Sequence, residues 1–184
     1  MSDLSPETAE ITCLSGQVIV FDLIGVLARP SWRELCINPD LELWRRLKVG
    51  AIPESMLWPA EQGTAYRAAL GLRGDRLALL ARLRARGVAI VIASNLAREW
   101  LPTARARMPA GLIARWLVSG ELGVAKPDPR FWAEVLRHVP RGTIVVDDQR
   151  LNCDAADAAG LRGLWVPSGA GFTARVEAAL RRPP

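Results

Sequence analysis

The chain has 184 residues, of which 50% are hydrophobic and 23% charged, and its formal net charge is +5. This length fits one globular domain with at most a small insertion, and the composition excludes global disorder and a coiled coil. No apolar run approaches the roughly 18 residues of a membrane span, and acids stand near the start where a secretory signal carries Lys or Arg, so we expect neither export nor a membrane anchor.

Side chains that bind zinc or form disulfides are scarce. Cys13, Cys36 and Cys153 have no paired spacing, and His138 is the only histidine. These counts exclude a structural zinc site and a disulfide framework, and they favour the reduced cytoplasm as the compartment. We expect His138 to be a surface or packing residue and Cys153 to fill a small buried space.

The positive charge is spread along the chain rather than gathered in one segment. Only two of the 24 basic residues are lysines, Lys48 and Lys126, and the arginines are scattered. This distribution indicates general electrostatic attraction rather than a dedicated nucleic-acid site. We therefore expect no specific nucleic-acid partner, and no pattern predicts an oligomeric state.

Apolar, β-branched runs alternate with helical patterns, which predicts an α/β fold with a parallel sheet flanked by helices. The predicted strands are residues 17–27, 88–93, 116–119, 143–146 and 164–166. The predicted helices are residues 75–86, 96–108, 128–139, 152–159 and about 173–182. Asp75 and Asp128 are candidate N-caps, and Pro102 predicts that the second helix is broken or begins late.

Residues 29–74 interrupt this alternation with short helical segments separated by prolines. We expect them to form a small helical cap inserted after the first strand, while residues 1–28 and 75–184 form the core. Trp32, Trp44 and Trp58 lie in this insertion. They either close an apolar lid over a site or form the core of the cap, and packing is the simpler explanation.

Polar residues stand at the ends of three predicted strands: Asp22, the pair Ser94-Asn95, and the pair Asp147-Asp148. Bound ligands lie outside the carboxyl ends of parallel strands, so we expect these side chains to meet there. Carboxylates that meet repel one another, and a divalent cation with one lysine relieves the repulsion.

Each polar residue also has a purely structural alternative. Ser94 and Asn95 can cap the helix that follows, and Lys126, within KPDP, can be a turn lysine. Adjacent acids such as Asp147 and Asp148 are harder to explain in this way, because they repel without a cation. In a chain rich in arginine, the compact ammonium of Lys126 favours a specific need for lysine.

Four segments, VIVFDLIGVL, VIASN, GVAKPDP and IVVDDQRLNCDAADAAG, follow one another in the chain. In this order they resemble the motifs of the haloacid dehalogenase (HAD) superfamily, over residues 18–160, and the resemblance implies a Rossmann-like sheet. It further implies that Asp22 is a nucleophile forming an aspartyl intermediate and that Ser94 binds a phosphoryl oxygen. Asn95 would lie beside the substrate, and Lys126 would neutralise the transferring group.

The resemblance also implies a Mg²⁺ site. Its ligands would be the Asp22 carboxylate, the main-chain carbonyl of Ile24, and Asp147 with Asp148 in support. Ile24 itself departs from the family pattern. Phosphatases of this superfamily carry a second acid there, which protonates the leaving oxygen and later activates water.

Isoleucine can perform neither task, and general acid–base catalysis contributes typically 10²–10⁴-fold. We therefore expect substrates with good leaving groups to phosphorylate Asp22 and the dephosphorylation to be slow. Dehalogenases of the superfamily lack this acid, but they also lack the metal-binding acids. Phosphonatase-type members use a cap lysine, for which Lys48 is the only candidate; we expect it to be an exposed, amphipathic lysine.

The leading hypothesis is a Mg²⁺-dependent phosphatase or phosphotransferase that acts on a small phosphorylated metabolite through Asp22, slowed or specialised by Ile24. Two alternatives stay open. One is a catalytically inactive protein of the same fold that serves as a binding module. The other is a metal-independent dehalogenase- or lyase-like reaction on an apolar substrate.

Overall fold

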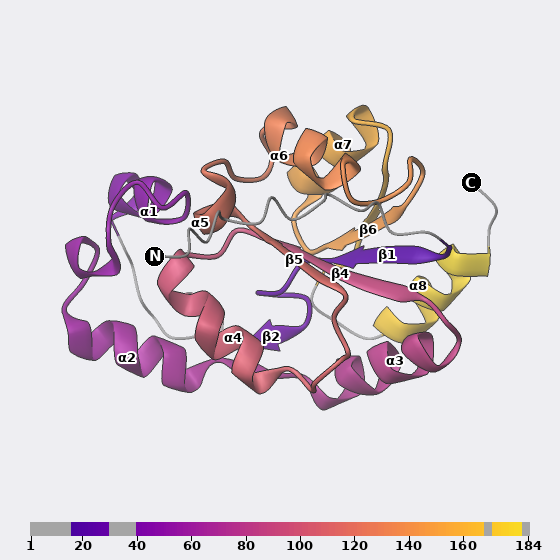
Figure 1. Cartoon of the computed structure of the whole chain (residues 1–184), viewed down its shortest axis with the longest axis horizontal. Helices are drawn as coiled ribbons and strands as arrows, with labels where there is room; N and C mark the ends of the chain where they lie inside the picture. The colour runs from indigo at the N-terminus through magenta and orange to yellow at the C-terminus, as the bar shows by residue number, and fades with distance from the viewer. Residues whose placement is uncertain (1–15, 30–39, 168–170, 182–184) are drawn as a thin grey trace, which may run out of the picture.

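The computed structural model describes residues 16–29, 40–167 and 171–181. Cys13, Cys36 and Trp32 lie outside the described residues. A five-stranded sheet forms the centre (Figure 1), and all its neighbouring strands are parallel. Its order is β5 (Arg115–Val118), β4 (Ala89–Ser94), β1 (Val18–Phe21), β6 (Ile144–Asp147) and β7 (Arg162–Trp165). The predicted α/β fold with a parallel sheet is therefore confirmed.

Helices cover both faces of this sheet (Figure 1). One face carries α3 (Gly74–Ala85) and α8 (Phe172–Arg181), and the other carries α6 (Pro129–Leu136) and α7 (Arg150–Ala158). Asp128 caps α6 as predicted, since its carboxylate accepts from the amide of Arg130 at 2.8 Å. The predicted cap at Asp75 is wrong, because α3 begins at Gly74 and places Asp75 in its first turn.

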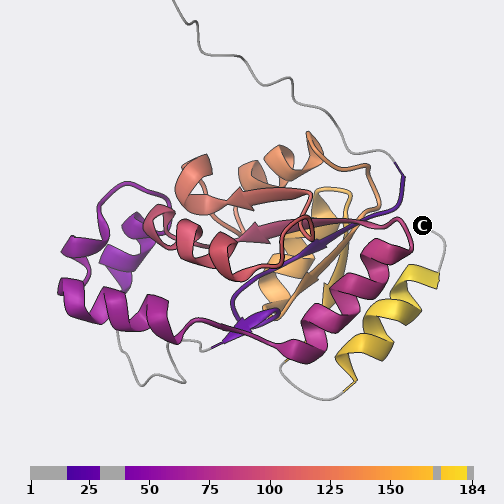
Figure 2. The same ribbon diagram turned by 60° about the horizontal axis from the view of Figure 1, so that its bottom comes forward.

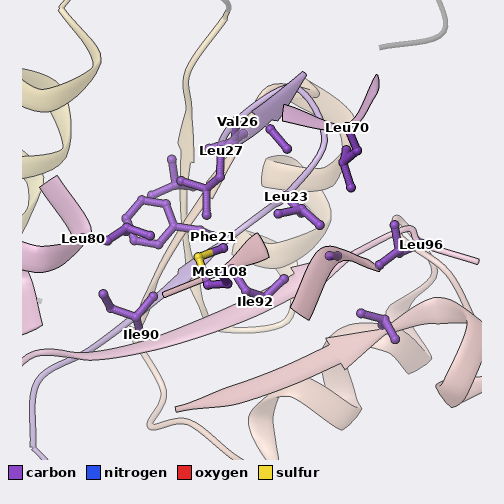
Figure 3. Packing of buried hydrophobic residues seen from close by; sticks show 14 of the residues in the cluster. Phe21, Leu23, Val26, Leu27, Leu70, Leu80, Ile90, Ile92, Leu96 and Met108 are labelled. Atoms are coloured by element: carbon purple, nitrogen blue, oxygen red, sulfur yellow. The ribbon is translucent and has the colours of Figure 1, made fainter. Parts of the chain in front are cut away.

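The side chains of β1 alternate between two apolar clusters, as expected for a strand buried on both faces. Ile19 and Phe21 belong to the cluster on the α3 side, and Val18 and Val20 to the cluster on the α6 side. Figure 3 shows Phe21 close to Leu80 of α3 within the first cluster. This central packing fixes the carboxyl end of β1.

The first predicted strand, residues 17–27, is wrong in its second half. Strand β1 ends at Phe21, and the chain then turns through Gly25 at φ +93°. Amides of Leu27 and Ala28 bond back to the carbonyl of Leu23 at 2.9 and 2.8 Å. Leu23 and Leu27 are fully buried within this turn, so their apolar character imitates a buried strand.

After this turn, β2 (Ala28–Arg29) pairs antiparallel with β3 (Gly71–Leu72). Between these strands the described chain forms α1 (Leu41–Leu47), the 3₁₀ turn η1 (Glu54–Met56) and α2 (Ala60–Ala69). Figures 1 and 2 show α1 and α2 beyond one end of the sheet, away from α8. The β2–β3 pair joins the two ends of this segment.

The remaining helices follow β4 and β5. After β4 come the 3₁₀ turn η2 (Arg98–Trp100) and α4 (Leu101–Arg107), with Pro102 in its first turn; α5 (Ser119–Leu122) follows β5. The late helix start is as predicted, because proline is tolerated where the amide needs no partner. Neither Ser94 nor Asn95 caps these helices. Across the described residues, no helix has the length and apolarity to cross a membrane.

Candidate active site

Three carboxylates meet at the carboxyl edge of the sheet, as the strand-end positions predicted. Asp22 follows β1, Asp147 ends β6, and Asp148 comes next; an oxygen of each lies within 4.8 Å of the others. Asp22 and Asp147 are buried and Asp148 is half-buried. Neighbouring strands β1 and β6 therefore concentrate negative charge at one protected point.

Lys126 provides positive charge at this point. Its Nζ donates to Asp22 Oδ1 at 2.8 Å, to Asp147 Oδ2 at 2.6 Å and to the carbonyl of Ala93 at 2.9 Å. Burial disfavours its charge, but Asp147 and Asp22 together raise the pKa of Lys126 above its ordinary value. All three ammonium hydrogens are thus directed at oxygens, which excludes a plain turn lysine.

One ammonium does not balance three carboxylates. Burial raises the pKa of Asp22 to about 7; Lys126 opposes this increase, and Asp147 adds to it. Burial and the charge of Asp147 also raise the pKa of Asp148. Within the described part of the chain, Asp148 Oδ1 is buried without a hydrogen-bond partner. Oxygen donors of this kind fit a hard divalent cation such as Mg²⁺.

The carboxylate of Asp147 is held by two further donors. Asn152 Nδ2 lies 3.0 Å from each of its oxygens, and the amide of Gln149 donates to Oδ1 at 2.8 Å. No sequence pattern indicated this contact of Asn152. Asn152 fixes the orientation of Asp147 from the first turn of α7.

Gly25 gives Asp148 the space that it occupies. A Cβ at Gly25 would overlap Asp148 Oδ2 and lie 2.8 Å from its Cγ. With φ at +93°, this backbone conformation also favours glycine. The sequence analysis did not single out Gly25, because its role depends on a contact between segments far apart in the chain.

Ser94 and Asn95 have different environments. Ser94 Oγ is buried and, within the residues described, has no hydrogen-bond partner. Asn95 makes a reciprocal pair with the backbone of Lys126: its Nδ2 donates to the carbonyl at 3.0 Å, and its Oδ1 accepts from the amide at 2.8 Å. Asn95 therefore holds the segment that carries Lys126, whereas the Ser94 hydroxyl is available to a ligand.

A cavity of about 990 Å³ opens over these groups. Core residues that line it include Asp22, Ile24, Ser94, Asn95, Lys126 and Asp148, and residues of the inserted segment include Arg29, Trp44, Lys48 and Tyr66. The expectation that Lys48 is exposed is wrong. It is half-buried in the cavity wall, and burial, followed by the charge of Arg45, lowers the pKa of Lys48.

Aromatic rings connect the inserted segment to the core. Trp100 of η2 stacks on Trp44 at 5.5 Å and on Trp58 at 5.8 Å between ring centroids, and Tyr66 lies 4.6 Å away. Glu54 accepts from Trp100 Nε1 at 2.6 Å. Trp44, Tyr66 and Trp100 also line the cavity, so the same residues pack against one another and form part of the cavity wall. No sequence pattern marked Trp100, which lies outside the predicted cap.

Two further buried residues, His138 and Cys153, have packing roles. His138 is buried, with Nε2 3.3 Å from Glu134 Oε1, which confirms a packing role. Cys153 belongs to α7 and is buried; its Sγ donates to the carbonyl of Asp147 at 3.8 Å, and burial raises the pKa of its thiol to about 12. It is the small buried residue that we expected.

The sequence pattern of haloacid dehalogenase-like hydrolases matches residues 31–160. The chain belongs to this HAD family. The matched range begins after Asp22 and Ile24, so it does not include the departure from the family pattern.

The similar proteins include one phosphatase and other HAD enzymes. A phosphoserine phosphatase from Thermus thermophilus is 32% identical over 157 residues, which is 79% of this chain and 60% of that protein. A HAD-family enzyme from Bacteroides thetaiotaomicron, crystallised with magnesium and inorganic phosphate, is 17% identical and superposes with a TM-score of 0.69. The superposition covers 85% of this chain and 96% of the Bacteroides chain. A predicted HAD-like hydrolase from Porphyromonas gingivalis is 16% identical with a TM-score of 0.70, covering 91% and 98%. These structures share the fold.

Proposed function

We propose that this HAD protein is a Mg²⁺-dependent phosphatase or phosphotransferase that acts on a small phosphorylated metabolite. The supporting observation is the buried contact between Asp22 and Lys126 beside the unpartnered hydroxyl of Ser94, all on one cavity. The phosphatase relative supports the same chemistry, although this chain spans 60% of its length.

In this proposal Asp22 attacks the phosphorus atom of the substrate and forms a covalent aspartyl phosphate. Lys126 holds one carboxylate oxygen of Asp22 at 2.8 Å, which leaves the other oxygen as the attacking atom. Its ammonium also offsets negative charge on the transferring group, and Ser94 Oγ donates to a phosphoryl oxygen. Asn95 keeps Lys126 in place rather than contacting the substrate.

Mg²⁺ would be held by Asp22, Asp147, Asp148 and the main-chain carbonyl of Ile24. The unpartnered Asp148 Oδ1 fits this role, and within the described residues no donor bonds to the Ile24 carbonyl. When bound, the ion would neutralise carboxylate charge and polarise the phosphoryl group. The grouped acids favour this chemistry over the metal-independent dehalogenase-like alternative.

Hydrolysis of the aspartyl phosphate would be the slow step of the proposed reaction. Asp22 and Asp148 are the only acids among the described residues that line the cavity, and Ile24 stands where the family has a further acid. Since Asp22 carries the phosphoryl group and Asp148 is a candidate metal ligand, neither is available as a general base. We expect dephosphorylation of Asp22 to be slower by about 10²–10⁴-fold than with an acid at position 24.

The test is release of 4-nitrophenol from 4-nitrophenyl phosphate with Mg²⁺ at high enzyme concentration. We expect a burst equal to the enzyme concentration, then a slow phase, and an intact mass increased by one phosphoryl group. Asp22→Asn should abolish the burst, and exposed Asp154→Asn, the matched control, should keep it. A folded wild-type protein without a burst or mass increase would contradict the proposal and favour an inactive binding module.

A further inference from the structure

Three arginines gather where the inserted segment rejoins the core. Arg29 ends β2, Arg73 directly follows β3, and Arg76 lies in the first turn of α3. Burial lowers the pKa of Arg76, and the positive charges of Arg73 and Arg29 lower it further. Since like charges repel one another, this cluster needs a negative partner.

Asp75 is the only acid among the described residues whose charge raises the pKa of Arg76, and it is a weak partner. Its Oδ1 lies 3.6 Å from Arg73 Nε, and its Oδ2 lies 3.1 Å from Arg76 Nε. The contact with Arg76 is not aligned for a hydrogen bond, and the Asp75 side chain is 59% exposed. Ion pairs with an exposed partner contribute little, so one carboxylate leaves most of the positive charge uncompensated.

Two guanidinium nitrogens beside Asp75 are buried and unsatisfied. Within the part of the chain that the structure describes, Nη1 of Arg73 and Nη1 of Arg76 have no hydrogen-bond partner. The Arg76 side chain is 3% exposed, and its guanidinium carbon lies 3.5 Å from the ring centroid of Phe172 on α8, the helix beside α3 (Figure 2). A ring face attracts a cation but leaves these N–H groups without an acceptor. Buried charged groups normally have hydrogen bonds, so the two nitrogens indicate a ligand that the described chain does not supply.

The N-terminus of α3 provides space and further donors for this ligand. The helix has 12 residues, and Arg73 at its N-cap position makes no side-chain capping bond. Among the described residues, the amides of Gly74 and Asp75 have no acceptor. A Cβ at Gly74 would meet no atom within 4 Å, and the Arg73 side chain is 22% exposed, so solvent reaches this point. Amides and dipole at a helix N-terminus both attract anions.

We propose that the start of α3 binds a tetrahedral oxyanion: the phosphate group, as inorganic phosphate or as part of a phosphorylated metabolite. The guanidinium groups of Arg73 and Arg76 would donate to its oxygens, together with the amides of Gly74 and Asp75. The oxyanion displaces the Asp75 carboxylate, because a dianion attracts two guanidinium groups more strongly than one exposed carboxylate does. None of these four residues lines the cavity above Asp22, so this site is separate from the candidate active site.

The experiment measures Tm with sulfate, an unreactive tetrahedral dianion, and with chloride at equal ionic strength, both in EDTA. Without a divalent cation, the three carboxylates around Asp22 disfavour an anion in the active-site cavity, so the result does not depend on the proposed phosphoryl chemistry. For a dissociation constant of about 1 mM, 20 mM sulfate should raise Tm by about 5 °C. Chloride should raise it by less than about 1 °C, and inorganic phosphate should act as sulfate does.

Substitution of either arginine tests the site directly. Arg73→Met and Arg76→Met should each lose at least about half of the difference in Tm between sulfate and chloride. Arg86→Met, at the exposed opposite end of α3, is the matched control and should keep the full difference. Because Arg73 is partly exposed, its variant gives a result even if Arg76→Met does not fold. A full sulfate effect in Arg73→Met would show only the general stabilisation by sulfate and overturn the proposal.

Asp75→Asn separates an anion site from a purely structural ion pair. The variant lacks the carboxylate that competes with the ligand, so the sulfate concentration that gives half of the Tm increase should fall by about 5-fold. An unchanged or higher concentration would overturn the proposal.

Glycerol 2-phosphate distinguishes the two sources of the phosphate group. If it raises Tm at lower concentration than inorganic phosphate does, the ligand is a phosphorylated metabolite; if it needs a higher concentration, the ligand is the free ion. Absence of an increase with both compounds would overturn the proposal.

Discussion

Asp22→Asn is predicted to stabilise the protein at pH 8 when divalent cations are removed. In the folded chain three carboxylates lie around one ammonium, and burial raises the pKa of Asp22 from 3.8 to about 7. Each pKa unit corresponds to about 1.4 kcal/mol, so ionised Asp22 costs the folded state at most about 4 kcal/mol. Asparagine removes this charge and keeps an oxygen that can accept from Lys126.

We expect a net gain of about 1–3 kcal/mol in the free energy of unfolding, because the substitution also removes attraction to Lys126. For a chain of this size, this corresponds to an increase of about 5 °C in Tm. The measurement is thermal unfolding with EDTA, followed by circular dichroism. Exposed Asp154→Asn is the control and should change stability by less than about 1 kcal/mol.

The pH dependence of this stability difference shows whether the charge of Asp22 causes it. The folded pKa of Asp22 lies above the unfolded value, so the folded protein binds more protons between about pH 4 and pH 7. Wild-type stability is therefore highest below this range and decreases as pH rises through it, whereas the variant lacks this decrease. The difference at pH 5 should be about half of that at pH 8 or less. A variant that is less stable at pH 8, or equally shifted at both pH values, would refute the reasoning.

Two further predictions concern the surroundings of the site. In Gly25→Ala, the new Cβ would overlap the Asp148 carboxylate of the proposed metal site, so the Mg²⁺ concentration needed to raise Tm should increase at least about 10-fold. Gly123→Ala is the control: it also has a positive φ but open space around it, so it should lower stability without changing the Mg²⁺ concentration required. Glu54→Ala removes the acceptor of Trp100 Nε1 and should lower the unfolding free energy in urea by about 1–3 kcal/mol, whereas exposed Glu61→Ala should change it by less than about 0.5 kcal/mol.

The sheet and the centre of the site were predictable because their signals are local. Continuous apolar runs mark strands buried on both faces, and a polar residue at such a strand end can face only the ligand edge. Asp22 and Asp147 meet for this reason. Lys126 was predictable from charge, since crowded carboxylates need a cation.

Other features depend on contacts that local patterns do not encode. Leu23 and Leu27 are as buried as strand residues but lie in a turn, because burial alone does not determine backbone conformation. The sequence around Lys48 is typical of an exposed helix end, but the hydrogen bond from Ser119 to its carbonyl holds Lys48 at the cavity wall. Trp100 contributes a ring to a segment that lies far away in sequence. Each of these depends on tertiary contacts between distant parts of the chain.

An inactive binding module and a phosphoryl-transfer enzyme make different demands on the same groups. Ser94 Oγ is a buried hydroxyl that lacks a hydrogen-bond partner within the described residues, and Asp148 Oδ1 is a carboxylate oxygen in the same situation. Asp22 is a carboxylate that burial disfavours. A phosphoryl group would accept a hydrogen bond from Ser94 Oγ, and a divalent cation would bind Asp148 Oδ1 and the Asp22 carboxylate. A phosphorylated substrate together with the cation would therefore offset the cost of burying all three groups. A protein surface docked outside the cavity would compensate none of them. These unmet interactions around Asp22 therefore favour phosphoryl transfer, even though Ile24 cannot assist the hydrolysis of the aspartyl phosphate.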